Sequence, residues 1–306
     1  MEKLLFIFIH IGIPVLTLFT VLFYKPRTRL GAIFTLLFLG LMLVFLYFWG
    51  QWPIVLSLYF KYVLGAIGVL AAISFLRNWK NTQPLFPRSF WGITKTMLVA
   101  LFSILMAVLT FQIIQGRSFG QPPVELAFPL KSGSFYVSSG GSNRVINNHF
   151  GTPNSSQWYA LDLNKLGKWG MVSSPPLSAR NAAHSIFGEQ VYAPCNGLVI
   201  AAKNTVLDNT EASMQVSRAD GMGNFIVLDC KGIIVSMSHL QHQSLKIRQG
   251  QSVRAGDPLG RVGNSGFSQE PHLHFQAARH TRDSILEGIP VQFNGYAPVR
   301  NDVIRN

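Results

Sequence analysis

The chain has 306 residues, of which 48% are hydrophobic and only 13% charged, and its mean hydropathy is positive at +0.27. This composition excludes an ordinary soluble enzyme, because soluble domains carry about 25% charged residues. The net charge of +13 is unevenly placed: residues 1–116 hold nine bases and one acid, whereas residues 117–306 hold seventeen bases and twelve acids. We therefore expect one lipid-soluble half and one globular half.

Four apolar stretches are each long enough to cross a hydrocarbon core, which takes roughly 20 residues. They are residues 4–24, 30–49, 53–76 and 97–114. Each is expected to be a transmembrane helix, because lipid offers the backbone no hydrogen-bonding partners. The first is too long for the apolar part of a secretory signal and lacks a small-residue cleavage site, so we interpret it as a retained span.

The loops between these stretches carry an uneven charge. The first and third loops are basic, whereas the second, around residues 50–52, has no charged residue. The basic residues are Lys25, Arg27, Arg29, Arg77, Lys80, Arg88 and Lys95. Because basic loops stay in the cytoplasm, this pattern predicts that everything beyond Gln115 lies on the outer side of a lipid bilayer.

The excess of basic residues is better explained by membrane orientation than by nucleic-acid binding, since no motif of the usual nucleic-acid modules is present. His10 and Lys61 lie inside spans, but no pairing of acids with bases there indicates an ion pathway. Anchoring is therefore the expected role of this membrane region, which we assign to residues 1–115.

A proline-rich segment at 116–130 is predicted to be a linker, followed by a globular domain at 131–306. In that domain the apolar runs shorten to strand length between turn signals, which is typical of an all-β fold. The predicted antiparallel strands are residues 159–163, 190–192, 198–202, 225–229, 233–238, 259–262 and 272–276.

Histidines gather in this domain. His272 and His274 are two residues apart, so on a strand both imidazoles lie on the same face. His239 ends another predicted strand, and Asp162 closes an apolar run where a lone carboxylate needs a partner. Zinc accepts this set of nitrogen and oxygen ligands, and a catalytic zinc keeps one position for water. The pattern predicts a zinc site.

The run from Gly188 to Gln276 resembles the lysostaphin-type, or LytM-like, zinc endopeptidases that cut peptidoglycan peptides. The matching phrases include residues 191–199, 223–228, 238–240, 253–266 and 271–275, among them Ser-His-Leu and Pro-His-Leu-His-Phe. With residues 159–162 added, the likeness covers the motif core 159–276 and none of the membrane half. The resemblance implies a peptidase fold and activity. Together with the apolar stretches and the basic loops, it predicts a membrane-anchored enzyme of the bacterial inner membrane, its catalytic domain on the periplasmic or extracellular side.

Carried over position by position, the resemblance implies that His274 and Asp162 bind zinc and that His239 and His272 flank the attacking water. His272 is the favoured general base, while His239 would orient the water or stabilise the oxyanion. Phe275, Leu273 and Leu240 are expected to be core partners of these strands.

One position departs from the family. Its first ligand is a histidine four residues before the aspartate, and here that position is Trp158, which cannot bind zinc. His149, thirteen residues before Asp162, is the favoured replacement because closing such a loop costs little entropy. His184 is the alternative.

The tryptophan also keeps a second function open: a catalytically inactive LytM-like domain that binds cell wall or regulates another hydrolase. A third reading, a lipoyl-like carrier hairpin at 253–263, lacks a lysine at a hairpin tip. His242 and His280 are expected to be surface groups, and the long segments 164–187 and 203–222 to shape a substrate groove or to be plain insertions.

The only two cysteines are Cys195 and Cys230. If the strands at 198–202 and 225–229 pair antiparallel, the two sulfurs come together at the open end of that hairpin. On the outer side of a membrane disulfides persist, so a disulfide between them is predicted.

Overall fold

The structure is a computed structural model that describes all residues except 1, 24–26, 78, 80–83 and 211–219. Two residues named above, Lys25 and Lys80, the last residue of the stretch 4–24 and part of the segment 203–222 lie outside the described residues. The chain divides into two compact units, Met1–Ile114 and Gln115–Asn306. Each unit is described by itself.

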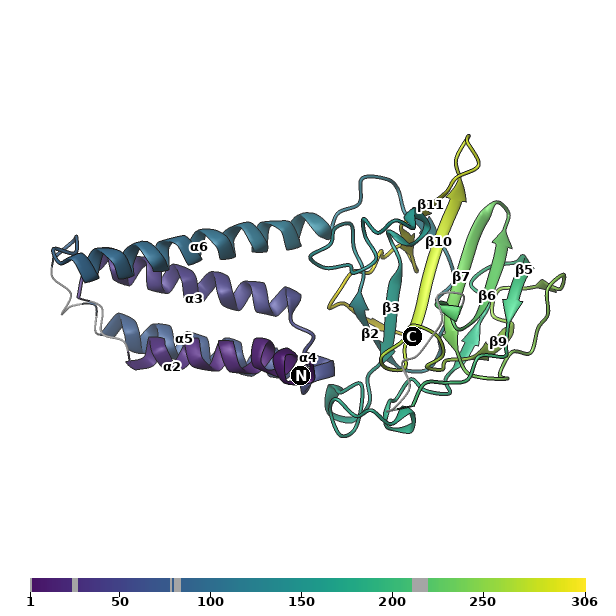
Figure 1. The fold of residues 1–306 in the computed structure, drawn as a ribbon, viewed down its shortest axis with the longest axis horizontal. Coiled ribbons are helices and arrows are strands. Elements are labelled where there is room, and N and C mark those ends of the chain that lie inside the picture. The colour runs from purple at the N-terminus through teal and green to yellow at the C-terminus, as the bar shows by residue number, and fades with distance from the viewer. Residues whose placement is uncertain (1, 24–26, 78, 80–83, 211–219) are drawn as a thin grey trace. The chain divides into compact units, whose positions relative to one another are not determined.

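The first unit is helical (Figure 1). Its elements are α1 (Glu2–Ile7), the π-helical turn η1 (Phe8–Gly12), α2 (Ile13–Phe23), α3 (Arg29–Trp49), α4 (Trp52–Val55), α5 (Phe60–Arg77) and α6 (Phe90–Gly116). Four stretches are long and apolar enough to cross a membrane: Leu4–Phe23, Arg29–Trp49, Phe60–Arg77 and Phe90–Gly116. The prediction of four long apolar helices is confirmed.

Two of these helices have other limits than predicted. The span predicted at 53–76 is interrupted, because α4 ends at Val55 and α5 begins only at Phe60. Pro53 is tolerated in α4 since it lies in the first turn, where its missing N–H costs nothing. The span predicted at 97–114 begins earlier, at Phe90, where the Ser89 hydroxyl accepts a hydrogen bond from the Gly92 N–H at 3.2 Å.

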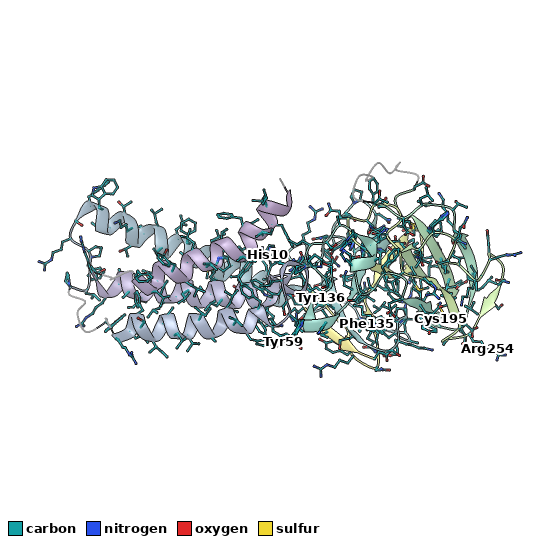
Figure 2. All side chains as sticks on the ribbon, turned by 90° about the horizontal axis from the view of Figure 1, so that it is seen from below. His10, Tyr59, Phe135, Tyr136, Cys195 and Arg254 are labelled. Atoms are coloured by element: carbon teal, nitrogen blue, oxygen red, sulfur yellow. A yellow bond between two sulfur atoms is a disulfide. The ribbon has the colours of Figure 1, made fainter. Side chains whose placement is uncertain are left out.

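The helices bury one apolar stripe and expose another. Leu39, Met42 and Phe75 are buried in the helical core, whereas Leu70 and Phe102 are 64% and 50% exposed. Figure 2 shows side chains projecting outward all along these helices. Exposed apolar surface on this scale is unfavourable in water and suits lipid. His10 is buried and its ring stacks on that of Trp49 at 5.1 Å.

The second unit is built on a nine-stranded antiparallel sheet with the order β13-β2-β3-β10-β7-β6-β5-β8, where β11 also pairs with β10 (Figure 1). The strands are β1 (Val124–Glu125), β2 (Ser134–Ser139), β3 (Leu161–Lys165), β4 (Gln190–Tyr192), β5 (Gly197–Lys203), β6 (Asn224–Cys230), β7 (Ile233–Leu240), β8 (Ser252–Val253), β9 (Pro258–Arg261), β10 (Leu273–His280), β11 (Leu286–Ile289), β12 (Val291–Gln292) and β13 (Val303–Arg305). Two small sheets, β1-β12 and β4-β9, complete it.

Alternation explains the sheet. In β6 the buried and half-buried residues alternate strictly, so Ile226 and Leu228 point into the core. Leu240, Leu273 and Phe275 are all fully buried, as expected of core partners. These side chains fix β7 and β10 side by side beneath the histidines.

The segment predicted to be a linker, 116–130, belongs to the fold. Within it β1 pairs parallel with β12, and Leu126 and Leu130 lie in the hydrophobic core. Proline content indicated a linker, but these apolar residues bury too much surface to remain outside. The strand predicted at 159–163 begins at Leu161, because the Ala160 N–H closes a turn on the Gln157 carbonyl at 2.8 Å.

The hairpin predicted from residues 198–202 and 225–229 is confirmed as β5 and β6, with Leu198 opposite Asp229. Cys195 and Cys230 are joined in a disulfide at its open end, with their Cα atoms 5.9 Å apart. Cys195 is labelled in Figure 2.

Candidate metal centre

Asp162 and His274 face each other across two neighbouring strands. Asp162 on β3 is the direct partner of His274 on β10, and the distance from His274 Nδ1 to Asp162 Oδ1 is 3.0 Å. Directly opposite residues of an antiparallel pair point to the same face of the sheet, so the register alone brings this imidazole to the carboxylate.

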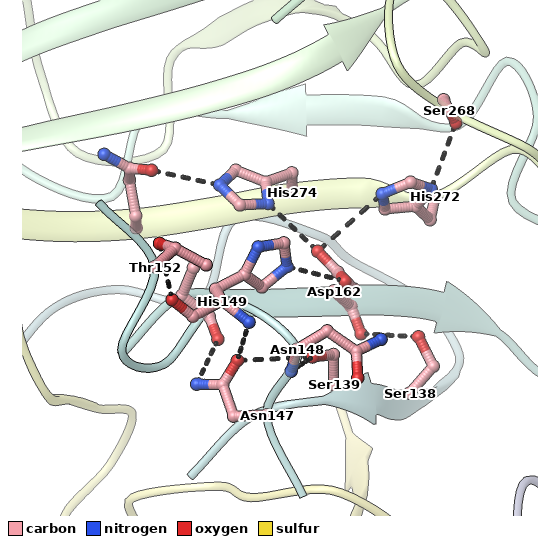
Figure 3. A network of polar contacts seen from close by, with 12 residues as sticks. Ser138, Ser139, Asn147, Asn148, His149, Thr152, Asp162, Ser268, His272 and His274 are labelled. Carbon is pink, nitrogen blue, oxygen red and sulfur yellow. Dashed lines mark hydrogen bonds and ion pairs between the residues drawn. The ribbon is translucent and has the colours of Figure 1, made fainter. Parts of the chain in front are cut away.

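His149 reaches the same carboxylate from a loop. Its Nε2 lies 2.9 Å from Asp162 Oδ2, the oxygen that His274 leaves open, and the rings of His149 and His274 are 4.6 Å apart at their centres. Figure 3 shows both imidazoles converging on Asp162. The ligand atoms of these three residues all lie within 4.8 Å of one another, which suits a single metal ion.

The hydrogen bonds of His274 indicate that a cation belongs at its Nδ1. Its other nitrogen, Nε2, lies 3.0 Å from Gln276 Oε1, and the Gln276 amide nitrogen donates to Ser156 Oγ. Because the Gln276 oxygen can only accept, Nε2 carries a proton, and in the tautomer with this single ring proton Nδ1 presents a lone pair to Asp162. Two acceptors at 3.0 Å repel unless a proton or a metal lies between them, so the residues fit a metal.

His239 and His272 stand beside this group, with their ring centres 4.8 Å apart. The Nδ1 of His239 lies 2.8 Å from the Ser265 carbonyl, and the Nδ1 of His272 lies 2.8 Å from the Glu270 carbonyl. A carbonyl accepts only, so in both neutral rings Nδ1 carries the proton and Nε2 is an acceptor. The Nε2 of His272 is 3.7 Å from Asp162 Oδ1.

His239 is held in an unusual backbone conformation. Its φ is +61°, in the left-handed region that few residues other than glycine adopt but that histidine tolerates better than most. The Gly263 N–H donates to the His239 carbonyl at 3.0 Å and the His239 N–H to the Met222 carbonyl at 3.1 Å. The end of β7 is thereby turned toward His272.

Four ionisable groups of the site, Asp162, His149, His239 and His272, have shifted pKa values. Burial raises the pKa of Asp162, but the charge and the hydrogen bond of His149, with smaller contributions from the neighbouring His274 and His272, outweigh it, so that pKa lies well below its usual value. Burial lowers the pKa of His149, and the Asp162 carboxylate more than compensates, leaving it raised.

The other two histidines shift the opposite way. Burial, assisted by His272 and His274, holds the pKa of His239 well below its usual value. Burial also lowers the pKa of His272, against the opposing pull of Asp162. Both side chains are therefore neutral acceptors near pH 7.

Trp158, at the position of the family's first metal ligand, stabilises the structure instead. Its indole N–H donates to the Thr152 carbonyl at 2.9 Å and its ring packs on Phe150 at 5.4 Å. These contacts tie down the loop that carries His149. The alternative ligand His184 is buried elsewhere, with its Nε2 2.8 Å from the Ser178 carbonyl. The structure thus brings His149, and not His184, to Asp162.

Two polar residues of the site were not found by sequence reasoning. Asn147 is fully buried, and its amide nitrogen donates to the carbonyls of Gly141, Trp158 and Ala160 while its oxygen accepts from the His149 N–H. Figure 3 shows Asn147 beneath His149. Of the two, Gln276 was the easier to predict from the sequence. It continues the two-residue spacing of His272 and His274, which places it on the same face of the strand.

A third, Asn209, holds the turn between β9 and β10. It is buried, and its amide nitrogen donates to the carbonyls of Gly266 and Ser268 at 2.7 and 2.9 Å. That turn supplies the Ser265 and Glu270 carbonyls that orient His239 and His272. Within the described part of the segment 203–222, Asn209 therefore supports the turn that orients the histidine pair.

The two remaining histidines of this unit bond locally. His242 Nδ1 lies 3.1 Å from the Val206 carbonyl and His280 Nδ1 lies 3.3 Å from the Ser284 carbonyl. His280 is exposed, and His242 is half-buried. Neither belongs to the group of residues described above.

A comparison with protein families finds a match within the second unit. The sequence model of peptidase family M23 matches residues 182–285, which include His239, His272 and His274. Residues 182–285 form a peptidase M23 domain. The match begins after His149 and Asp162, so the two residues that complete the M23 domain's candidate metal group come from the preceding part of the unit.

Relatives of the M23 domain are distant. An "uncharacterized metalloprotease" of Buchnera aphidicola is 29% identical over 109 residues, which are 35% of this chain and 26% of that protein. The chain thus spans about a quarter of the length of that relative.

Solved structures of similar proteins include a zinc-containing peptidase from Vibrio cholerae, 17% identical, covering 53% of this chain and 37% of that one with a TM-score of 0.32. The catalytic domain of lysostaphin from Staphylococcus simulans is 23% identical, covering 36% of this chain and 80% of that one with a TM-score of 0.25. Both TM-scores are low, so the assignment rests on the match of the M23 domain itself.

Proposed function

We propose that this chain is a membrane-anchored zinc metalloendopeptidase that hydrolyses peptide bonds in peptidoglycan. The observation that carries the proposal is the Asp162 carboxylate between His149 and His274, with one imidazole on each oxygen. An M23 domain on an apolar helical unit is consistent with this function.

The metal ligands would be His149, Asp162 and His274, a set of two imidazoles and one carboxylate that zinc favours in catalytic sites. A zinc ion held there supplies a Lewis acid that polarises the peptide carbonyl and makes a water molecule more acidic. Gln276 would keep His274 in the tautomer that presents Nδ1.

His272 is suited to the role of general base. Its Nε2 is an acceptor, and the Glu270 carbonyl on Nδ1 stabilises the ring when Nε2 takes the proton of the attacking water. His239 is fixed in the same tautomer by the Ser265 carbonyl, so its neutral ring accepts a hydrogen bond and orients that water. After protonation, the Nε2–H of His272 can donate to the leaving amine.

The substrate follows from location and resemblance. The basic first and third loops favour a location of the M23 domain on the outer side of the membrane, the compartment in which a bacterial inner-membrane protein meets peptidoglycan. The sequence motifs shared with lysostaphin-type enzymes favour peptidoglycan peptides over other polypeptides as the substrate.

The test is zinc content together with cleavage of purified muropeptides by the full-length protein in detergent. About one zinc per chain and cleavage are expected for the parent protein. His149→Ala and His274→Ala should each lose zinc and at least about a thousandfold in activity, since several kcal/mol of transition-state stabilisation disappears.

His280→Ala, at an exposed histidine outside the group, is the matched control and should behave like the parent. A folded, zinc-free parent that sediments with cell wall but cleaves nothing would instead support the binding or regulatory function.

A further inference from the structure

A basic cavity lies at one end of the helical unit, where the residues before α3 meet the beginning of α6. Its volume is about 570 Å³, and its lining includes Arg27, Arg88 and Lys95. Thr28, Ser89, Thr96 and Trp91 complete the polar and aromatic part of the lining. All of them belong to the unit Met1–Ile114.

Backbone hydrogen bonds close the frame of this cavity. The N–H groups of Arg29 and Leu30 donate to the carbonyls of Pro84 and Leu85, both at 3.2 Å. At the start of α3 the Thr28 hydroxyl accepts from the Gly31 N–H at 3.2 Å. The first amides of α3 are thus occupied within the chain, and the attraction for an anion comes from the cationic side chains.

These three cations lack a carboxylate partner of their own. Arg27, Arg88 and Lys95 are exposed, and in the described part of the helical unit no ion pair involves them. The only acid among residues 1–116 is Glu2. The span Leu4–Phe23 separates it from Arg27 by 20 helical residues, roughly 30 Å, several times the distance over which salt screens a charge.

Membrane orientation accounts for basic loops but not for their convergence. Orientation requires positive charge anywhere near the ends of the spans. Here cations from the first loop, the third loop and the first turns of α6 line one cavity together with three hydroxyl side chains. Arginine forks, a lysine and hydroxyls are the donors that recognise a phosphate group.

The surroundings of the cavity favour a phosphate that belongs to a lipid. Large apolar side chains in the first turns of α3 and α6, the helices that begin at the cavity, are exposed: Ile33 is 46%, Ile93 41% and Met97 67% accessible. Trp91 is 70% accessible, as expected of an interfacial anchor. Acyl chains can lie along this apolar surface while the headgroup enters the cavity.

We propose that this cavity is a binding site for the phosphate headgroup of an anionic phospholipid. The proposal rests on the membrane location proposed above for the helical unit, and does not depend on peptidase activity. Arg88 and Arg27 bind the phosphate oxygens, and Lys95 supplies a third positive charge.

The test uses the full-length protein in nanodiscs of phosphatidylcholine with a minor share of phosphatidylglycerol, and native mass spectrometry to count the retained phosphatidylglycerol. The double variant Arg88→Gln/Lys95→Gln should retain at least about tenfold less, since each lost charge-assisted hydrogen bond weakens binding by about that factor. Arg77→Gln, a basic residue at the end of α5 outside the cavity lining, is the matched control and should retain the parent amount.

Equal phosphatidylglycerol retention by the double variant and by Arg77→Gln overturns the proposal. Inorganic phosphate that binds the lipid-free protein and displaces phosphatidylglycerol at millimolar concentration would assign the cavity to a free phosphate and also overturn it. If the double variant unfolds, as judged by circular dichroism, Arg27→Gln alone provides the measurement.

Muropeptide cleavage by the same samples separates the two proposals. An inactive parent that still retains phosphatidylglycerol refutes the proposed peptidase and leaves the lipid site intact.

Discussion

His274 and His149 reach Asp162 from two different kinds of structure. His274 lies in the middle of the sheet, on a strand that pairs with β3 on one side and β7 on the other. His149 lies in a loop that the buried amide of Asn147 and the indole of Trp158 hold in place. On the strand side, the position of His274 depends only on the register of the sheet. On the loop side, the position of His149 depends on several side-chain hydrogen bonds. Mutations on the two sides should therefore affect stability and metal binding differently.

The largest effect on folding is expected on the loop side. Asn147→Ala leaves buried carbonyls of Gly141, Trp158 and Ala160 without their donor. We expect a loss of about 2–4 kcal/mol in the free energy of unfolding, because each unsatisfied buried group costs about 1–3 kcal/mol. Thermal or denaturant unfolding measures it.

Asn148→Ala, at the exposed neighbour, should change that free energy little. Equal stability of the two variants would mean that the loop does not depend on the Asn147 amide.

On the strand side the effect should fall on the metal and much less on folding. Gln276→Leu removes the acceptor for His274 Nε2, and we expect zinc affinity to fall about 10–100-fold, as is usual for the outer partners of a metal ligand. A competition assay with a chelating dye reports that affinity. Gln276→Glu keeps an acceptor and should restore most of it; failure to do so would contradict the assigned tautomer.

A smaller effect is expected from the turn that orients His239 and His272. Asn209→Ala should lower kcat about tenfold at unchanged zinc content, because the turn bears on the base and not on the ligands. In ¹⁵N spectra the two imidazoles should lose their single tautomer. Leu207→Ala, at a side chain that is 71% exposed on the same segment, is the matched control; loss of zinc from Asn209→Ala would contradict this division of roles.

The smallest effect is a pH dependence of the metal-free protein. The pKa of His149 is raised by Asp162, so the stability that their contact contributes is fully present below pH of about 6.5 and is lost as pH rises through the folded-state pKa. In EDTA, the parent should therefore exceed His149→Gln in stability by more at pH 6 than at pH 9. A difference that grows with pH instead would reverse the assigned sign.

The same contrast explains what the sequence predicted. Alternation and the two-residue spacing of the histidines suffice for β5, β6 and β10, because strands are local patterns. The shared metal role of His274 and Asp162 was implied by the family resemblance, and no local pattern predicted the register that places them opposite each other. The prediction that His149 reaches Asp162 rested only on the low entropic cost of closing the short loop between them. Asn147 and Asn209 act on carbonyls that approach them in space, and no local pattern marks such residues.

The segment 116–130 shows the other limit. Val124 and Glu125 form a strand only because Val291 and Gln292, far along the chain, lie beside them. Likewise β2 pairs with β13, although β13 begins at Val303, 164 positions after β2 ends at Ser139. Pairings of this kind depend on the assembled core.

The disulfide between Cys195 and Cys230 makes the β5–β6 hairpin a closed covalent ring. Cleavage of any one peptide bond between the two cysteines opens the chain but does not divide the protein, since the sulfurs still join both pieces. Asn209, which supports the turn beside the histidines, lies within this ring. The protein can therefore be cleaved once between these two cysteines and still remain one molecule, resolved into two bands only after reduction.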